Sequence, residues 1–217
     1  MKRAIIIGVA LLALAAAGWS ALWHVVAGKV EDGLDRWIAR EAAAGRVWTC
    51  PERRVDGFPK QIQVTCANPA FQGRLGGRQA SGRLGTLIAL GRVTDPNRVL
   101  FDLQGPLTAE YEDGRALELN WSALRVILGR AGTSLDNATF VIEDARLSAT
   151  GLPAPLAAER VQADLKANPR LDPATNASDG GYALYLRVVG GAFAPLDRLL
   201  PATAPIEIET QGRLTRG

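Results

Sequence analysis

The most constraining feature of this chain is a long uncharged apolar run near its N-terminus. It covers residues 4–27 and is interrupted only by two glycines, a serine and a histidine. As an α-helix of about 24 residues it is roughly 36 Å long, enough to cross a hydrocarbon core of about 30 Å with some tilt. Trp19 and Trp23 lie near its far end, where indoles favour the membrane interface. The run predicts a membrane anchor over residues 1–28.

Two basic residues, Lys2 and Arg3, precede the run and predict that the N-terminus stays in the cytoplasm while the chain beyond Lys29 is exported. The alternative is a cleaved signal peptide with an apolar core at 5–14 and small residues at 15–17. Apolar residues continue well past that site, which favours a retained anchor. Both interpretations export the same domain.

Residues 29–45 keep a helical pattern. Apolar side chains recur with helical spacing, charged residues fill the other face, and Gly45 provides a C-terminal stop. Such a helix either lies on the lipid or packs on the exported domain. Its acidic residues favour packing on the domain. The apolar face comprises Val30, Leu34, Trp37, Ile38 and Ala42.

The chain has two cysteines, Cys50 and Cys66, and export places both in an oxidising compartment, where a disulfide is expected. Midway between them, Gly57, Phe58 and Pro59 have the chemistry of a turn. Two strands folded about this turn would bring Cys50 opposite Cys66, and closing a loop of about 15 residues contributes roughly 3 kcal/mol. A redox or metal site is disfavoured, because no Cys-x-x-Cys spacing or nearby histidine is present.

The remaining sequence, 46–217, predicts a mainly β domain: a curved antiparallel β-meander or half-barrel. Strands are predicted at 139–148, 160–167, 182–189 and 206–214, and an exposed loop at 171–181. The turn signals are Asn68-Pro69, Gly76-Gly77, Asp95-Pro96-Asn97, Gly105-Pro106, Asp113-Gly114, Gly151-Leu152-Pro153 and Asn168-Pro169.

The strand register of one hairpin can be predicted from its apolar pattern. A three-residue loop at 112–114 pairs Ala109 with Leu117 and Leu107 with Leu119, and places Gly114 at a left-handed position. One face then holds apolar residues that form either a groove for a hydrophobic ligand or the core beneath the helix. The other face holds Thr108, Glu110, Glu118 and Asn120, which we interpret as a solvated surface rather than an acid/base pair. The apolar set is Leu107, Ala109, Tyr111, Leu117, Leu119 and Trp121.

Charge and motifs disfavour several classes of function. The formal net charge is +3, of which Lys2 and Arg3 supply two, and no basic cluster follows, so nucleic acid is not an expected partner. The sequence has no nucleophile elbow, phosphate-binding glycine loop or metal-ligand spacing. The single histidine, His24, lies in the anchor and is interpreted as an interfacial residue. We therefore expect neither an enzyme nor a cofactor or metal.

These features together resemble the DUF2125 family of membrane-anchored envelope proteins of alphaproteobacteria. The residues that carry the resemblance are Trp19, Trp23, Trp37, Cys50, Gly57-Phe58-Pro59, Cys66, Pro69, Trp121 and the run from Ala158-Glu159-Arg160 to Pro169. The resemblance implies a single-pass protein of the inner membrane with its bulk in the periplasm, and a version short at its C-terminus. It implies no activity and no catalytic residues.

Two hypotheses for the function follow. The first is a non-catalytic module that binds lipid or another hydrophobic ligand in the apolar groove during envelope biogenesis. The second is a structural subunit of an envelope complex that pairs with a partner protein through an open strand edge.

Overall fold

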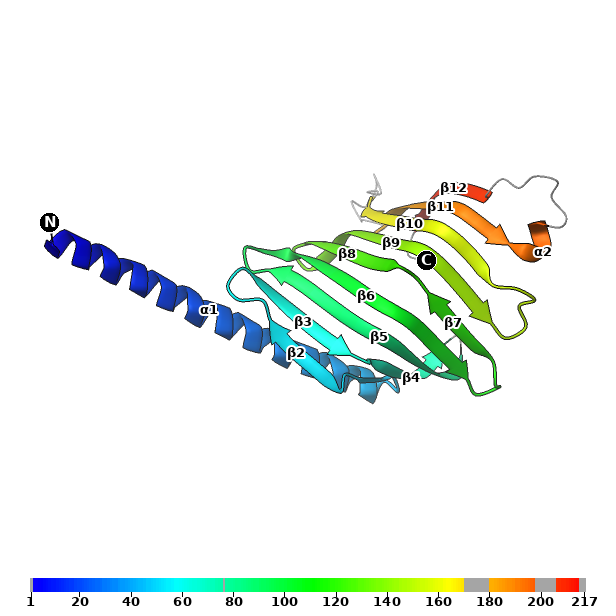
Figure 1. Ribbon diagram of the computed structural model, residues 1–217, viewed down its shortest axis with the longest axis horizontal. Coiled ribbons are helices and arrows are strands. Elements are labelled where there is room, and N and C mark those ends of the chain that lie inside the picture. Colours follow the sequence, from blue (N-terminus) through cyan, green and yellow to red (C-terminus); the bar gives the residue numbers. More distant parts are fainter. Residues whose placement is uncertain (1, 76, 170–179, 198–205, 215–217) are drawn as a thin grey trace, which may run out of the picture.

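A computed structural model describes the whole chain except residues 1, 76, 170–179, 198–205 and 215–217. The described part consists of one long helix, one antiparallel sheet and a short second helix (Figure 1). The predicted fold class is confirmed in its β content and antiparallel pairing. The elements are α1 Lys2–Ala43, β1 Val47–Thr49, β2 Glu52–Asp56, β3 Gln61–Ala67, β4 Ala70–Leu75, β5 Arg78–Arg92, β6 Asp95–Tyr111, β7 Ala116–Asn120, β8 Ala123–Ala131, β9 Ser134–Ala149, β10 Leu156–Ala167, β11 Tyr182–Phe193, α2 Ala194–Asp197 and β12 Ile206–Leu214.

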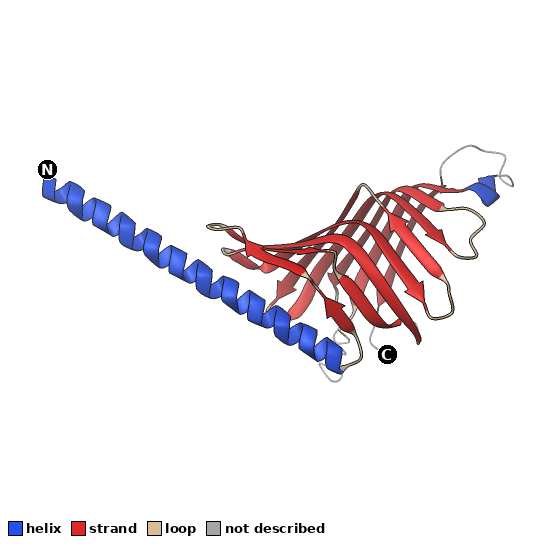
Figure 2. Ribbon diagram, turned by 60° about the horizontal axis from the view of Figure 1, so that its bottom comes forward, coloured by secondary structure: helices blue, strands red, loops and turns tan. Residues whose placement is uncertain are grey.

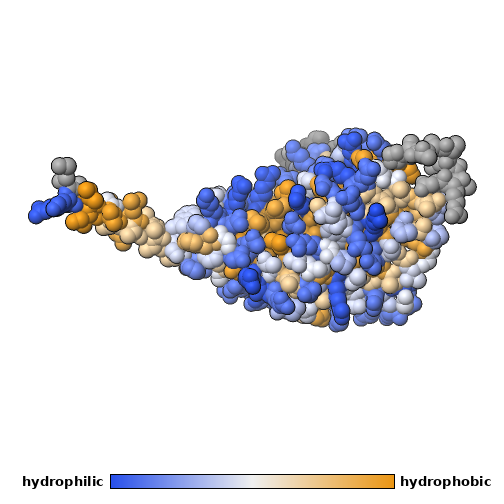
Figure 3. All heavy atoms as spheres, in the orientation of Figure 1, coloured by the Kyte–Doolittle hydropathy of each residue, from blue (hydrophilic) through white to orange (hydrophobic). Residues whose placement is uncertain are grey.

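Helix α1 joins the predicted anchor and the predicted amphipathic helix without a break. Its N-terminal part is long and apolar enough to cross a membrane. Figure 3 shows this part projecting from the domain with hydrophilic residues at its tip. The helix ends just before Gly45, whose φ of 77° is the left-handed conformation that glycine adopts without strain.

The sheet is built from long strands and from pairs of short strands that share one position. Strand β5 pairs with β3 along one part of its length and with β4 along the other. In the same way β6 and β9 both pair with β7 and with β8. Strands β9 to β12 then follow in order as antiparallel neighbours. The described ends of the sheet are β1 and β2 on one side and β12 on the other.

Most predicted turns and strands are confirmed, with two corrections. Asp95-Pro96-Asn97 begins β6, and the turn lies at 93–94. Gly105-Pro106 does not end a strand, because β6 continues through it with a register shift opposite β5. Proline lacks an N–H and is tolerated in a strand at such irregularities. The predicted loop 171–181 lies almost wholly outside the described residues.

Helix α1 packs along the edge of the sheet formed by β1 and β2 (Figure 2). Asp35 forms an ion pair with Arg53 of β2 at 2.6 Å, and the ring of Trp37 lies 5.6 Å from that of Trp48 in β1. Trp23 is 6% exposed and packs against Ile62 of β3. The predicted packing of the helix on the domain is confirmed. The contact also begins earlier in the helix than the predicted boundary at residue 29.

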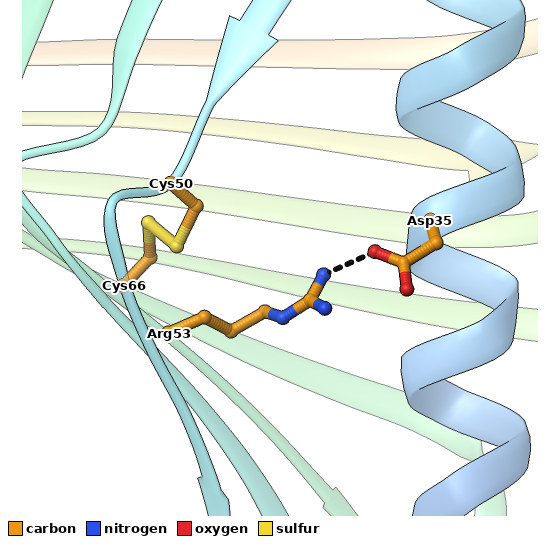
Figure 4. Close-up of a disulfide and its surroundings, with 4 residues drawn as sticks. All are labelled: Asp35, Cys50, Arg53 and Cys66. Carbon is orange, nitrogen blue, oxygen red and sulfur yellow. Dashed lines mark hydrogen bonds and ion pairs between the residues drawn. A yellow bond between two sulfur atoms is a disulfide. The ribbon is translucent and has the colours of Figure 1, made fainter.

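The disulfide joins Cys50 and Cys66, with their Cα atoms 5.6 Å apart (Figure 4). The predicted register around it is wrong, because the residue directly opposite Cys66 is Arg53. Cys50 lies between β1 and β2, which pair with different strands. The disulfide therefore ties the bend between two short edge strands to β3.

Candidate functional site

The most extensive feature of the sheet is a face on which apolar side chains follow one another from strand to strand. Directly paired residues of neighbouring strands point to the same side, so the register defines each row. We call this side the helix-side face, since Ile62 on it packs against α1. Its three rows in β3, β5, β6, β8, β9, β10 and β11 are Cys66-Leu87-Leu103-Leu124-Ile142-Val161-Val188, Val64-Ala89-Phe101-Val126-Phe140-Ala163-Leu186 and Ile62-Gly91-Val99-Leu128-Ala138-Leu165-Leu184.

The rows of the predicted groove lie in the other half of the sheet. Leu107 pairs with Leu119 and Ala109 with Leu117, so the predicted hairpin register is confirmed. The Tyr111 N–H donates to the Arg115 carbonyl at 2.8 Å across the three-residue loop. The rows extend to Leu84-Leu107-Leu119-Leu147-Leu156 and to Phe71-Gly82-Ala109-Leu117-Ala149.

A transverse line of irregular backbone separates the two halves. Asn68 and Asp144 have φ values of 51° and 52°, and Gly190 has φ 66°. Between them, a Cβ at Gly85 would lie 2.5 Å from the Gly105 carbonyl oxygen. We call this line the crease. A left-handed residue or a bulge breaks the two-residue alternation of a strand. The side chains beyond it therefore point to the opposite face from the one that regular alternation would give them.

This change of face can be followed in β9, where the apolar residues of the helix-side face switch from even-numbered to odd-numbered positions. In β9 they are even-numbered before the crease, as in Phe140 and Ile142, and odd-numbered after it, as in Leu147. Without the phase change, Leu147 would point to the opposite face from Ile142.

Contacts with α1 show that both halves present their apolar residues to the same side. Arg53, which is paired with Cys66, reaches Asp35 of the helix. Phe71 is paired with Trp48, whose ring contacts Trp37 of the same helix. The helix-side face is therefore continuous across the crease.

Helix α1 covers only one end of this face. Its ion pair and ring contacts reach β1, β2 and β3, and the face beyond β5 lies away from it (Figure 2). Ile142 and Leu124 are 4% and 6% exposed, but most other apolar residues of the face are only half-buried. The helix therefore does not form a layer over β6 to β12, as the alternative interpretation of a closed core would require.

Among the predicted groove residues, Ala109 is buried and the rest are half-buried. Trp121 lies between β7 and β8, with ring atoms 3.5–3.6 Å from where a Gly105 Cβ would be. Its indole N–H donates to the Leu103 carbonyl at 2.7 Å. Trp121 thus packs at the crease, beside the point where the register between β5 and β6 shifts.

The opposite face is more polar. Asp164 accepts hydrogen bonds from Thr139 and Gln162, both at 2.7 Å. Glu110 pairs with Ala116 and Glu118 with Thr108, so the two glutamates are not opposite each other, as predicted. Asn120 donates to Glu118 at 2.7 Å. This face also carries an apolar row, Leu90-Leu100-Ile127.

Two open hollows lie at opposite ends of the helix-side face. One, of about 420 Å³, is lined by Val99, Phe101, Leu128, Arg130, Thr133 and Leu135. The other, of about 510 Å³, includes Tyr111 with more polar neighbours. Within the described residues, no group of three or more His, Cys, Asp or Glu side chains is placed to hold a metal ion.

The predicted groove residues lie in the β6–β7 hairpin and at Trp121, and the apolar rows of the helix-side face extend well beyond them. The rows from β8 to β11 were missed although their alternation is visible, as in Leu124, Val126 and Leu128. The predicted turn Gly57, Phe58 and Pro59 also has a position that was not foreseen. It joins β2 to β3 and lies against α1, where Trp19 donates to the Pro59 carbonyl at 2.9 Å.

Comparison with known proteins gives one match. No curated protein and no solved structure matches the chain. One family model, described as an uncharacterized protein conserved in bacteria, matches residues 23–216 and so covers most of α1's packed part and the whole described sheet. The chain therefore belongs to the DUF2125 family.

Proposed function

We propose that the protein is a membrane-anchored, non-catalytic module whose helix-side face receives lipid or another hydrophobic ligand. The observation that carries the proposal is the continuity of this face: apolar rows cross from β3 to β11 and remain half-exposed where α1 does not reach. Half-exposed apolar surface of this extent is a suitable binding surface for acyl chains.

The anchor supports the same proposal. Helix α1 has an apolar N-terminal segment of sufficient length to span a bilayer, and the charges of Lys2 and Arg3 before it favour a cytoplasmic N-terminus. The disulfide between Cys50 and Cys66 suits an oxidising compartment. In a bacterium this arrangement corresponds to an inner-membrane protein with its sheet in the periplasm, where lipids destined for the envelope are available.

Energetics favour the helix-side face over the opposite one. Covering about 400 Å² of apolar protein surface with an acyl chain would yield about 10 kcal/mol before the cost of immobilising the ligand. On the opposite face, the same ligand would also cover the hydrogen-bonded carboxylate of Asp164, and burying such a group is unfavourable.

Photo-crosslinking from neighbouring residues of one strand tests the proposal. A benzophenone side chain at Val126 or Leu186 faces the helix side, whereas one at Arg125 or Arg187 faces the opposite side. Irradiation of the full chain in membranes, followed by mass spectrometry, should give lipid adducts at 126 and 186 and few at 125 and 187. Equal yields on the two faces, or none on the helix side, would contradict the proposal.

A second candidate function is pairing with a partner protein through β12. In the described residues β12 pairs only with β11, and its Ile208 is 50% exposed. Open edges of this kind pair readily with a further strand. Crosslinkers at Glu209 should then capture one reproducible neighbour in membranes, with Arg187 in β11 as the control position. Capture of only this chain itself, or the same products from both positions, would count against it.

A further inference from the structure

We infer that the β2–β3 turn, residues 57–60, is a second membrane contact that rests in the interface of the leaflet next to the β domain. The inference rests on the proposed anchor, because it requires α1 to span the bilayer. It does not require that the helix-side face binds a ligand.

The position of the turn on α1 makes the contact unavoidable for a spanning helix. Trp19 donates to the Pro59 carbonyl at 2.9 Å, and Trp23 donates to the Gln61 carbonyl at 2.8 Å. Only the helix before Trp19 is free of the domain. From Ile5 to Gly18 the free apolar segment is about 21 Å long, short of a hydrocarbon core of about 30 Å.

The outer side of α1 supplies the missing length. Leu22 and Val25 are 48% and 56% exposed, whereas Trp23 and Ala27 on the sheet side are 6% and 7% exposed. From Ile5 to Val25 the helix is about 31 Å long, which matches the hydrocarbon core. Lipid must then extend to the level of Val25 on one side of the helix while the turn occupies the other side at the same depth.

The turn has a suitable side chain for that depth. Phe58 is 53% exposed although it is a large apolar residue. Its ring lies edge-on to Trp23 at 5.7 Å and stacks on His24 at 6.5 Å. Gly57 allows the turn, since its φ is 103° and a Cβ there would lie 2.8 Å from the Gln61 carbonyl oxygen. Trp23 is buried beneath the turn, whereas Phe58 and Trp19, which is 37% exposed, present aromatic side chains of the type found at membrane interfaces.

Exposed basic residues at this end of the sheet favour contact with an anionic membrane surface. Lys60, Arg92 and Arg98 are exposed and form no ion pair among the described residues. The Val93 N–H donates to the Lys60 carbonyl at 3.3 Å, so the β5–β6 turn lies beside the β2–β3 turn.

Acidic groups at the same end are fewer. They are Asp56, half-buried, and Asp95, exposed. Further along this end, Arg130 and Lys166 are exposed and Asp136 is half-buried. The excess of exposed basic groups fits the headgroups of anionic phospholipids.

Reporters placed beside the turn test its depth without altering it. An environment-sensitive fluorophore is attached to the full chain at Thr94→Cys in the β5–β6 turn, at Glu112→Cys in the hairpin at the other end of the sheet, or at Leu12→Cys in α1. The chain is placed in vesicles that contain anionic phospholipid and a lipid carrying a spin-label quencher, either near its headgroup or, in a parallel sample, on its acyl chain. We expect quenching at position 94 by the headgroup label, quenching at position 12 by the acyl-chain label, and little quenching at 112 by either.

The outcomes separate this inference from the proposed anchor. Quenching at position 12 with none at 94 overturns the interfacial turn and leaves the anchor standing. Absence of quenching at position 12 overturns the anchor and the inference with it. Phe58→Ser in the Thr94→Cys chain should reduce the quenching at 94, and unchanged quenching would also overturn the role of the turn.

Charge reversal tests the choice of lipid. Lys60→Glu with Arg92→Glu should weaken the quenching at 94 in anionic vesicles and leave it unchanged in zwitterionic ones, since each basic residue near an anionic surface contributes about a fivefold preference. The control is Arg83→Glu with Arg146→Glu, two exposed residues beyond the crease. An equal effect of the two double variants, or no difference between the vesicles, would overturn the anionic preference.

Discussion

Removal of the Trp23 side chain should separate α1 from the sheet. The indole is 6% exposed, packs against Ile62 and Phe58, and donates to the Gln61 carbonyl at 2.8 Å. A buried indole removes about 200 Å² from water, worth about 5 kcal/mol at about 25 cal/mol per Å². Alanine retains part of this burial, so we expect Trp23→Ala to destabilise the docked helix by about 3–4 kcal/mol.

The matched control is Trp19→Ala. Trp19 makes the same type of hydrogen bond, to the Pro59 carbonyl at 2.9 Å, but it is 37% exposed, so we expect a loss of about 1 kcal/mol. Hydrogen exchange of the full chain in detergent, followed by mass spectrometry of peptides from β2 and β3, measures the docking. Exchange there should accelerate strongly in Trp23→Ala and slightly in Trp19→Ala, while β10 and β11 stay unchanged. Equal effects of the two variants would refute the assignment of Trp23 as the main docking residue.

Three further predictions concern the sheet. Replacing Cys50 and its partner by Ser should lower the free energy of unfolding in urea by about 3 kcal/mol, because the disulfide closes a loop with a sequence separation of 16; an unchanged midpoint would contradict this. Gly190→Ala should cost at least about 1 kcal/mol, since φ is 66°, whereas Gly212→Ala, with open space around it, should be nearly neutral by the same measurement. A hydrogen bond from Arg115 lowers the pKa of Asp113 below its usual 3.8. The ionised Asp113 carboxylate therefore contributes to stability above pH 3.8, and this contribution is lost as the pH falls through the lowered pKa. Asp113→Asn should remove that part of the acid sensitivity in a pH series of urea unfolding curves.

Local patterns predicted the individual elements well. The stop at Gly45, the hairpin at 112–114 and the strands from β9 to β12 follow from helical spacing, two-residue alternation and turn chemistry, which are short-range properties. The pairing of Cys50 with Cys66 follows from their number and from the oxidising compartment that the N-terminal segment predicts. These features needed no knowledge of which strands become neighbours.

The register beside Cys66 and the docking of Trp23 could not be predicted in this way. Both depend on β1 pairing with β4 while β2 pairs with β3. No local sequence pattern predicts that two short strands share this edge of the sheet. Trp19 and Trp23 also have two physically sound uses, at a lipid interface or against a protein surface. Only the position of the β2–β3 turn shows that both indoles contact the domain.

The crease explains why the apolar face was underestimated from the sequence. Apolar alternation read along β9 changes phase at Asp144, so a regular strand would place Ile142 and Leu147 on opposite faces and each apolar patch would be short. Left-handed residues occur at the same level in β9 (Asp144), in β11 (Gly190) and at Asn68 between β3 and β4. Beyond each of them the apolar residues again point to the helix side. With them, the face continues along all 16 residues of β9, about 50 Å at about 3.3 Å per residue. One end of that path, with the hollow beside Phe101 and Arg130, belongs to the end of the sheet that carries the β2–β3 turn. A ligand that left the bilayer there would meet apolar side chains along the whole length of the strand, and a regular sheet of the same composition would interrupt that path halfway.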